Sequence, residues 1–374
     1  MTTARLPSLQ QLLSPFPVDA FTRQYDNRVP VILRPVVSTP IDLQALDAFV
    51  AEAGLRWPTV HLEDEDGPVH PSAYTTGVQW GTGVEPHLVQ VAELRAGLQR
   101  GHRVVFPDIQ RHHGSSAHVT RAYEASLHMR GSATAVLAPP DAAPRTIPAA
   151  ALHHHLLQCH GTRACVVTTP DGTSETFEVV VGCALYVPPG HTVSTTPSNG
   201  PSLAMDLALR PIRIRDLAAA ELATIPRDRL RDPVPAGLGQ DPNTLKRTWA
   251  GVVDQLLEGA NHEQVLESLV DGFVQSRLPM LRGQLTAPKR PLTAHTRIRR
   301  RPTVMYRITD HDSAIELRFH GKAVTFPRGA DAVVDFIVQA SDWAPVDLTG
   351  VPADHQLAIA QRLVSEGFCE FVDG

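Results

Sequence analysis

The sequence predicts an α+β protein in which a β-barrel with helices packed outside it is followed by a helical region and a small mixed unit. Short apolar strands separated by Gly, Pro and Asp-Gly turns fill residues 150–210, which is typical of a sandwich or barrel. Helical periodicity follows, and from about residue 290 three strands, two helices and a last strand are predicted in an order that resembles a winged helix. These changes predict three domains, at residues 1–210, 211–285 and 286–374.

The segment before the predicted barrel supplies its outer helices. Residues 41–54 place apolar side chains at helical spacing and end on Gly54, a natural C-cap. Further helices are predicted at residues 87–101 and 115–129. Each is followed by a predicted strand, at residues 102–109 and 132–140.

The composition is that of an ordinary globular protein. The 374 residues are 43% hydrophobic and 20% charged with a formal net charge of −5, so the surface as a whole does not attract nucleic acid or an anionic membrane. No apolar run predicts a transmembrane helix, and the N-terminal residues make a poor signal peptide. The four cysteines form no CxxC pair, which fits a reducing compartment. We therefore predict a cytoplasmic protein with no membrane partner.

Several motifs occur in an order that is similar to the cupin-type JmjC oxygenases of the ribosomal-oxygenase family. They are FPVDAFTRQYDNRVPVILRP (16–35), LRAGLQRGHRVVFPDI (94–109), LAPPD (137–141), LLQCHGTRACVV (156–167), VVGCALYVPPG (180–190) and DLTGVPADHQLAIAQRLVSEGF (347–368). The resemblance implies a double-stranded β-helix, a helical dimerisation region that forms a homodimer, and a winged helix that supports the barrel without reading DNA.

The resemblance also implies Fe(II) and 2-oxoglutarate as cofactors, held by a His-x-Asp pair, a distant His and a basic residue. Arg163 matches the basic residue that binds the far carboxylate of the cosubstrate, and Gln158 is expected beside it as a polar wall. The three positions that match the iron ligands are Pro148, Ala150 and Val193. None of these side chains offers a lone pair to iron.

A rearranged metal site is the alternative. His153 and His155 are two residues apart, so on a strand they face the same way, and His191 lies two places before Val193. These histidines, with His160 as a further candidate, could hold Zn, Cu, Fe or Ni. The other interpretation is that they are strand residues that form hydrogen bonds or line a polar cavity.

Two further charged side chains each allow more than one interpretation. Arg163 follows the turn at Gly161, so it is either a carboxylate-binding residue that points into a pocket or a solvated residue at a strand edge. Asp206 is the one acid in an apolar strand, and it is a pocket acid, a displaced metal ligand or an edge-facing side chain.

Charge is unevenly distributed near the C-terminus. Residues 277–310 contain nine Lys or Arg and one acid, whereas residues 312–374 contain ten acids and four Lys or Arg. Because an acidic surface repels phosphate, nucleic acid is not a predicted partner.

Two functions follow from these patterns. The first is an oxygenase-like protein that binds a peptide or protein and lacks the usual Fe(II)/2-oxoglutarate hydroxylase activity, as a pseudoenzyme or scaffold. The alternative is an atypical metal-dependent hydroxylase or oxidoreductase that modifies a peptide or protein side chain through the histidine-rich site.

Overall fold

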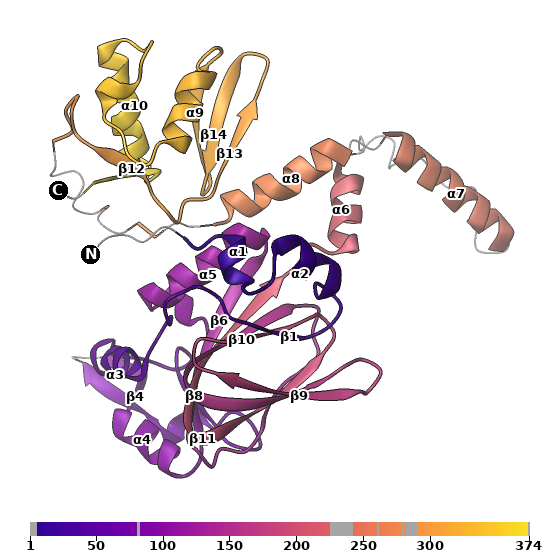
Figure 1. Ribbon diagram of the computed structural model, residues 1–374, viewed down its shortest axis with the longest axis vertical. Helices are drawn as coiled ribbons and strands as arrows, with labels where there is room; N and C mark the ends of the chain where they lie inside the picture. The colour runs from indigo at the N-terminus through magenta and orange to yellow at the C-terminus, as the bar shows by residue number, and fades with distance from the viewer. Residues whose placement is uncertain are drawn as a thin grey trace. The chain divides into compact units, whose positions relative to one another are not determined.

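The chain divides into two units, residues 1–211 and residues 212–374 (Figure 1). The computed structural model describes residues 6–80, 83–224, 242–259, 262–277, 280–281, 284 and 291–372. Residues 225–241 and 285–290, which belong to the predicted helical and winged-helix regions, lie outside the described residues. A boundary near residue 286 therefore stays a prediction.

A large antiparallel sheet forms the centre of the first unit (Figure 1). Its nine strands are β1 (Val31–Leu33), β2 (His61–Glu63), β5 (Arg103–Phe106), β6 (Arg130–Ala138), β7 (Arg145–Ile147), β8 (His153–Thr168), β9 (Ser174–Val180), β10 (Ala184–Val187) and β11 (Thr192–Arg210). The order is β1-β10-β8-β11-β6-β5-β2, with β9 paired to β8 and β7 paired to β11. The predicted mixed α and β content is confirmed and the sheet is antiparallel, whereas closure into a double-stranded β-helix stays a prediction.

The two longest strands, β8 and β11, change partners along their length. Residues 154–157 of β8 pair with β10, whereas residues 162–168 pair with β9. Gly161 lies between these two stretches with a φ of +67°, and a Cβ atom there would lie 2.2 Å from the carbonyl oxygen of Pro201 on β11. Because a backbone oxygen cannot move aside as a flexible side chain can, the close approach of the two strands requires glycine.

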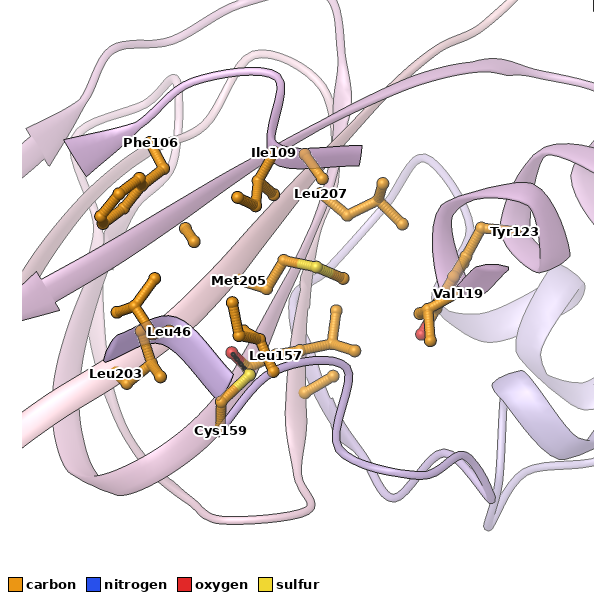
Figure 2. Close-up of a cluster of buried hydrophobic side chains, with 14 of the residues drawn as sticks. Leu46, Phe106, Ile109, Val119, Tyr123, Leu157, Cys159, Leu203, Met205 and Leu207 are labelled. Atoms are coloured by element: carbon orange, nitrogen blue, oxygen red, sulfur yellow. Dashed lines mark hydrogen bonds between the residues drawn. The ribbon is translucent and has the colours of Figure 1, made fainter. Parts of the chain in front are cut away.

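One face of the sheet packs against helices. They are α1 (Leu9–Leu12), α2 (Val18–Gln24), α3 (Leu43–Glu52), α4 (Val91–Gln99) and α5 (Gly114–Leu127). In Figure 2, Leu157, Met205 and Leu207 of the strands lie opposite Val119 and Tyr123 of α5. These side chains belong to one buried apolar cluster, and each large aliphatic side chain removed from water contributes about 1.5–3 kcal/mol.

The opposite side chains of the same strands form a second, smaller cluster, which we call the apolar cluster. It consists of Leu156, Cys165, Val167, Val179, Leu185, Val187 and Val193. Alternation along a strand explains the division, because Leu156 and Leu157 are neighbours that enter different clusters.

Most of the predicted outer elements are present. Residues 41–54 contain α3 and residues 115–129 contain most of α5. The predicted helix at residues 87–101 was wrong at its start, since α4 begins at Val91. The residues before it form β4 (Gly83–Val89), which pairs with β3 (Thr75–Trp80). Leu88 and Val89 also fit the helical spacing of α4, so the pattern alone did not reveal the hairpin.

The second unit combines helices with small sheets. Its helices are α6 (Ile214–Thr224), α7 (Pro242–Gly259), α8 (His262–Gln275), α9 (Asp331–Gln339) and α10 (Ala353–Ser365). Its strands are β12 (Ile298–Arg300), β13 (Tyr306–Asp310), β14 (Ala314–Phe319), β15 (Lys322–Pro327) and β16 (Cys369–Phe371). A core around the fully buried Trp343 joins these strands to α9 and α10. No helix in the described part of the chain is long and apolar enough to cross a membrane.

Candidate functional site

A chain of ion pairs connects four strands of the large sheet. Arg163 on β8 donates to the carboxylate of Asp206 on β11, with 2.9 Å between Nη1 and Oδ1. Arg145 on β7 lies 3.3 Å from the same carboxylate and 3.0 Å from the carboxylate of Glu63 on β2. The ring of His61 is 3.1 Å from Glu63. We call these five residues the ion network.

The Arg163–Asp206 pair of the ion network is buried, whereas Arg145, Glu63 and His61 are half-buried. Arg163 is 4% exposed and Asp206 is 7% exposed. Burial acts to lower the pKa of Arg163, but the negative charge of Asp206 outweighs it and raises that pKa. Burial acts to raise the pKa of Glu63, yet contacts with His61 and Arg145 lower it to about 2. Arg163 and Glu63 therefore stay ionised at neutral pH.

A small cavity lies beside Arg163. Its volume is about 20 Å³, and its polar lining is Arg103, Arg163, Thr195, Thr196, Ser202 and Asp206. Nε and Nη2 of Arg163 are buried there with no hydrogen-bond partner among the described residues. A space of this size holds about one water molecule. A five-carbon dicarboxylate such as 2-oxoglutarate does not fit beside Arg163 as these side chains lie.

Gln158, the other residue expected to contact the cosubstrate, is held within the protein. Its side-chain amide donates to the carbonyl oxygen of His160 at 2.7 Å and to the hydroxyl of Ser202 at 2.8 Å. Ser202 lines the cavity, so Gln158 supports the cavity wall. A cosubstrate role for Gln158 and Arg163 stays a prediction.

Of the positions predicted to match iron ligands, Val193 lies in an apolar environment, Pro148 is exposed and Ala150 is half-buried. Val193 is fully buried in the apolar cluster and lies opposite Ile147 in the pairing of β11 with β7. Pro148 directly follows β7, and the carbonyl oxygen of Ala150 accepts a hydrogen bond from the backbone of Gly190 at 2.8 Å. These side chains have no donor atoms, so the residues present at these positions do not fit Fe(II).

His153 and His155 face the helix-covered side of the sheet. His153 Nδ1 lies 3.0 Å from the hydroxyl of Tyr186, and the ring of His155 packs against Tyr186 and Tyr123. The expectation that the two histidines share a face is confirmed by their common contact with Tyr186. Burial, followed by the neighbouring His153 and His154, lowers the pKa of His155 to about 3. His155 is therefore a neutral side chain of the packed interior.

The other histidines do not complete a metal site. His154 lies between His153 and His155 and faces the opposite way, towards Asp206; burial lowers its pKa and Asp206 opposes that shift. His191 Nδ1 lies 3.2 Å from the carbonyl oxygen of Pro189, and His160 is exposed. Within the described ranges no group of three His, Cys, Asp or Glu side chains is placed to hold a metal ion. This geometry gives no support to a site built from His153, His155 and His191.

The sequence interpretation missed most of the ion network. Arg145, Glu63 and His61 stand in three-residue strands far apart in the chain, and only the fold brings them together. Among the interpretations of Asp206, the pocket acid is correct and the edge-facing acid is wrong. A sequence signal did exist, because a lone acid in an apolar strand needs a buried cation.

The basic stretch is largely paired with acids of the second unit. Arg297 pairs with Asp342, and Arg299 and Arg301 both pair with Glu370. Positions 282, 289 and 290 lie outside the described residues. The ion pairs leave less positive charge for phosphate than the sequence count suggests.

An open groove of about 490 Å³ lies at the β3–β4 hairpin. Its lining contains no charged carboxylate, lysine or arginine: Trp57, His70, Pro71, Ser72, Thr75, Thr76, Gly77, Pro86 and His87. Trp57 is 43% exposed, and its ring lies 5.5 Å from that of His87. An exposed aromatic side chain between prolines and hydroxyl groups is suited to an uncharged segment of peptide.

No family model and no curated protein matches the chain. Solved structures do match. A crystal structure of YcfD from Escherichia coli is 13% identical over 96% of this chain and 98% of that chain, with a TM-score of 0.55. A structure of that ribosomal oxygenase with cobalt and 2-oxoglutarate is also 13% identical, over 96% of this chain and 99% of that chain, with a TM-score of 0.53. The chain therefore has the fold of this ribosomal oxygenase, which confirms at the level of fold the resemblance seen in the sequence.

Proposed function

We propose that this chain is a JmjC/cupin oxygenase-like protein that binds a peptide or protein and has no Fe(II)/2-oxoglutarate hydroxylase activity. The observation that carries the proposal is the burial of Val193 in the apolar cluster, with Ile147 packed against that cluster, where the resemblance expects the metal. Iron needs nitrogen or oxygen donors in an open site. The aliphatic side chains here offer neither.

The activity test measures turnover directly. The purified protein is incubated with Fe(II), ascorbate, oxygen and 2-oxoglutarate, and succinate is quantified, with the E. coli ribosomal oxygenase and its substrate as the positive control. We expect succinate at the level of the protein-free background. Succinate formation above that background, abolished by Arg163→Met, would contradict the proposal.

Metal content separates the proposal from its alternative. The protein is purified without a His tag and analysed for Fe, Cu, Zn and Ni. We expect less than stoichiometric metal. A full equivalent that is lost in a His153→Ala, His155→Ala double variant would instead support the metal-dependent enzyme.

The groove at Trp57 is the proposed place for the peptide. Its aromatic and proline lining, exposed hydroxyls and lack of charged residues favour an uncharged, extended segment. A displayed library of such peptides would identify ligands, and Trp57→Ala should weaken their binding at least about tenfold, the effect of losing a contact residue worth about 1.4 kcal/mol. Val36→Ala, also at an exposed apolar side chain, is the control. Equal binding by both variants would remove the groove from the proposal.

We further propose that the helical region forms a homodimer. Apolar side chains on its helices are exposed within the single chain: Ile214, Leu217, Leu222, Leu245, Trp249 and Leu266. Trp249 on α7 is 62% exposed, and aromatic side chains of this kind are enriched in protein interfaces. Light scattering should give twice the monomer mass for the wild type and the monomer mass for Trp249→Glu. A monomeric wild type would overturn this part of the proposal.

A further inference from the structure

The contact between Asp206 and Arg163 is that of a carboxylate bound to an arginine, with the carboxylate supplied by the chain itself. The distance of 2.9 Å and the burial of both side chains are those of a charge-assisted hydrogen bond out of water. Arginine binds the carboxylates of ligands in the same way. Arg163 is also the residue that the sequence matched to cosubstrate binding.

Asp206 is fixed in this position from its other side. Arg145 lies 3.3 Å from its second carboxylate oxygen, and Glu63 fixes Arg145 at 3.0 Å. Asp206 also lies within β11, paired to Thr134 of β6 and Leu156 of β8, so its backbone cannot withdraw. A free carboxylate therefore cannot take the position at Nη1 of Arg163 while Asp206 is present.

Arg163 retains donor capacity beside this contact. Only Nη1 meets Asp206, whereas Nε and Nη2 are buried without a partner among the described residues, next to the cavity of about 20 Å³. Asp206 makes one hydrogen bond to Arg163. A small free carboxylate could turn to contact two guanidinium nitrogens at once, which is the stronger arrangement.

We infer that Asp206 is an internal substitute for a ligand carboxylate, and that shortening it opens a site for a small monocarboxylate such as formate between Arg163 and Arg145. The inference deepens the proposed function, on which it rests, because it explains how Arg163 is neutralised without a cosubstrate. Its test measures binding instead of turnover, so the two proposals can fail separately.

The test is chemical rescue of Asp206→Ala in the full-length protein. Formate is titrated into wild type and variant, and both the heat of binding and the thermal midpoint are measured in a buffer that contains no other carboxylate. The variant should bind formate at one site, and its midpoint should rise by about 3–5 °C when formate exceeds its dissociation constant tenfold. The wild type should show neither change.

Two further variants identify the groups responsible. Asp206→Asn fills the same space without a charge and should not respond to formate. Arg163→Met combined with Asp206→Ala has the space but lacks the cation, and it should not respond either. A response of Asp206→Ala no larger than that of the wild type, or an equal response of the double variant, overturns the inference.

The inference can still be tested if Asp206→Ala does not fold. If Asp206→Ala is unfolded in formate-free buffer, it is refolded from urea with and without formate, and the recovery of the circular dichroism signal is compared with that of the double variant. Recovery that depends on formate and on Arg163 is expected. Absence of recovery contradicts the inference.

Discussion

Two regions of one sheet face fill their space in opposite ways. Around Val193 the space is occupied by aliphatic side chains, whereas around Arg163 it is occupied by a network of buried charges. The regions are continuous, because Arg163, Cys165 and Val167 alternate along β8 and lead from one to the other. The resemblance in the sequence predicts iron-ligand positions at Val193 and cosubstrate binding at Arg163. In this chain, aliphatic side chains fill the space around Val193, and Asp206 neutralises the charge of Arg163.

The physical consequences of the two arrangements differ. Aliphatic packing gains free energy wherever water is excluded, so the apolar cluster tolerates changes of shape better than the addition of polar atoms. Buried charges are stable only as pairs, because the desolvation of each ion must be offset by its partner. Single changes in the ion network should therefore cost more than single changes in the apolar cluster.

The largest effect is expected when the ion network loses its shared acid. Asp206→Ala leaves Arg163 buried without a carboxylate, which should lower the free energy of unfolding by about 3–5 kcal/mol in urea denaturation. Glu175→Ala, which removes an exposed acid from β9, should change stability by less than about 0.5 kcal/mol. Similar values for the two variants would show that the network is not a buried charge system.

A somewhat smaller loss is expected where β8 passes between its two sets of partners. Gly161→Ala meets both a left-handed backbone and the carbonyl oxygen of Pro201, and should cost about 2–4 kcal/mol. Gly182→Ala is the matched control, because its φ is +81° but no atom lies within 4 Å of a Cβ there. The difference between their unfolding midpoints isolates the close approach of the strands. Equal costs would mean that backbone strain alone explains Gly161.

Exchange of a methyl for a hydroxyl should have unequal effects in the two regions. Val193→Thr places a hydroxyl in the apolar cluster without a partner and should cost about 1–3 kcal/mol. Thr195→Val makes the reverse change two residues along β11, where the hydroxyl has only a contact of 3.4 Å to the backbone of Arg145. It should cost less than about 1 kcal/mol. Urea denaturation of both variants measures the contrast, and a reversed order would refute it.

The smallest effect is expected when the pH is lowered. The pKa of His155 is about 3 in the folded protein, below its ordinary value of 6.5, so between these values the unfolded chain binds a proton that the folded chain does not. The contribution of His155 to the free energy of unfolding is therefore fully present above pH 6.5. It falls as the pH decreases below that value, by about 1 kcal/mol per pH unit.

Urea midpoints at pH 6.5 and 5.5 measure this loss. His155→Leu should lose less stability than the wild type over that interval, since His153 and His154 also have lowered pKa values and continue to contribute. An identical pH dependence in the two proteins would show that His155 is not held neutral by the fold.

Local patterns were sufficient for much of the fold. The Asp-Gly turn after β8, the helix of residues 41–54 and the shared face of His153 and His155 follow from neighbouring residues. The β3–β4 hairpin was missed because its last residues continue the apolar spacing of α4. Within the candidate site, Arg163 was identified from its motif, but its partner was not.

By itself the sequence determined the class of fold and the side chains at Pro148, Ala150 and Val193, because periodicity and residue chemistry are local properties. Only the tertiary structure decided that Asp206 meets Arg163 and that Arg145 joins both to Glu63. The members of each contacting pair are separated by 43 to 82 positions. Pairing over such distances depends on strand order and register, and no short pattern in the chain specifies either.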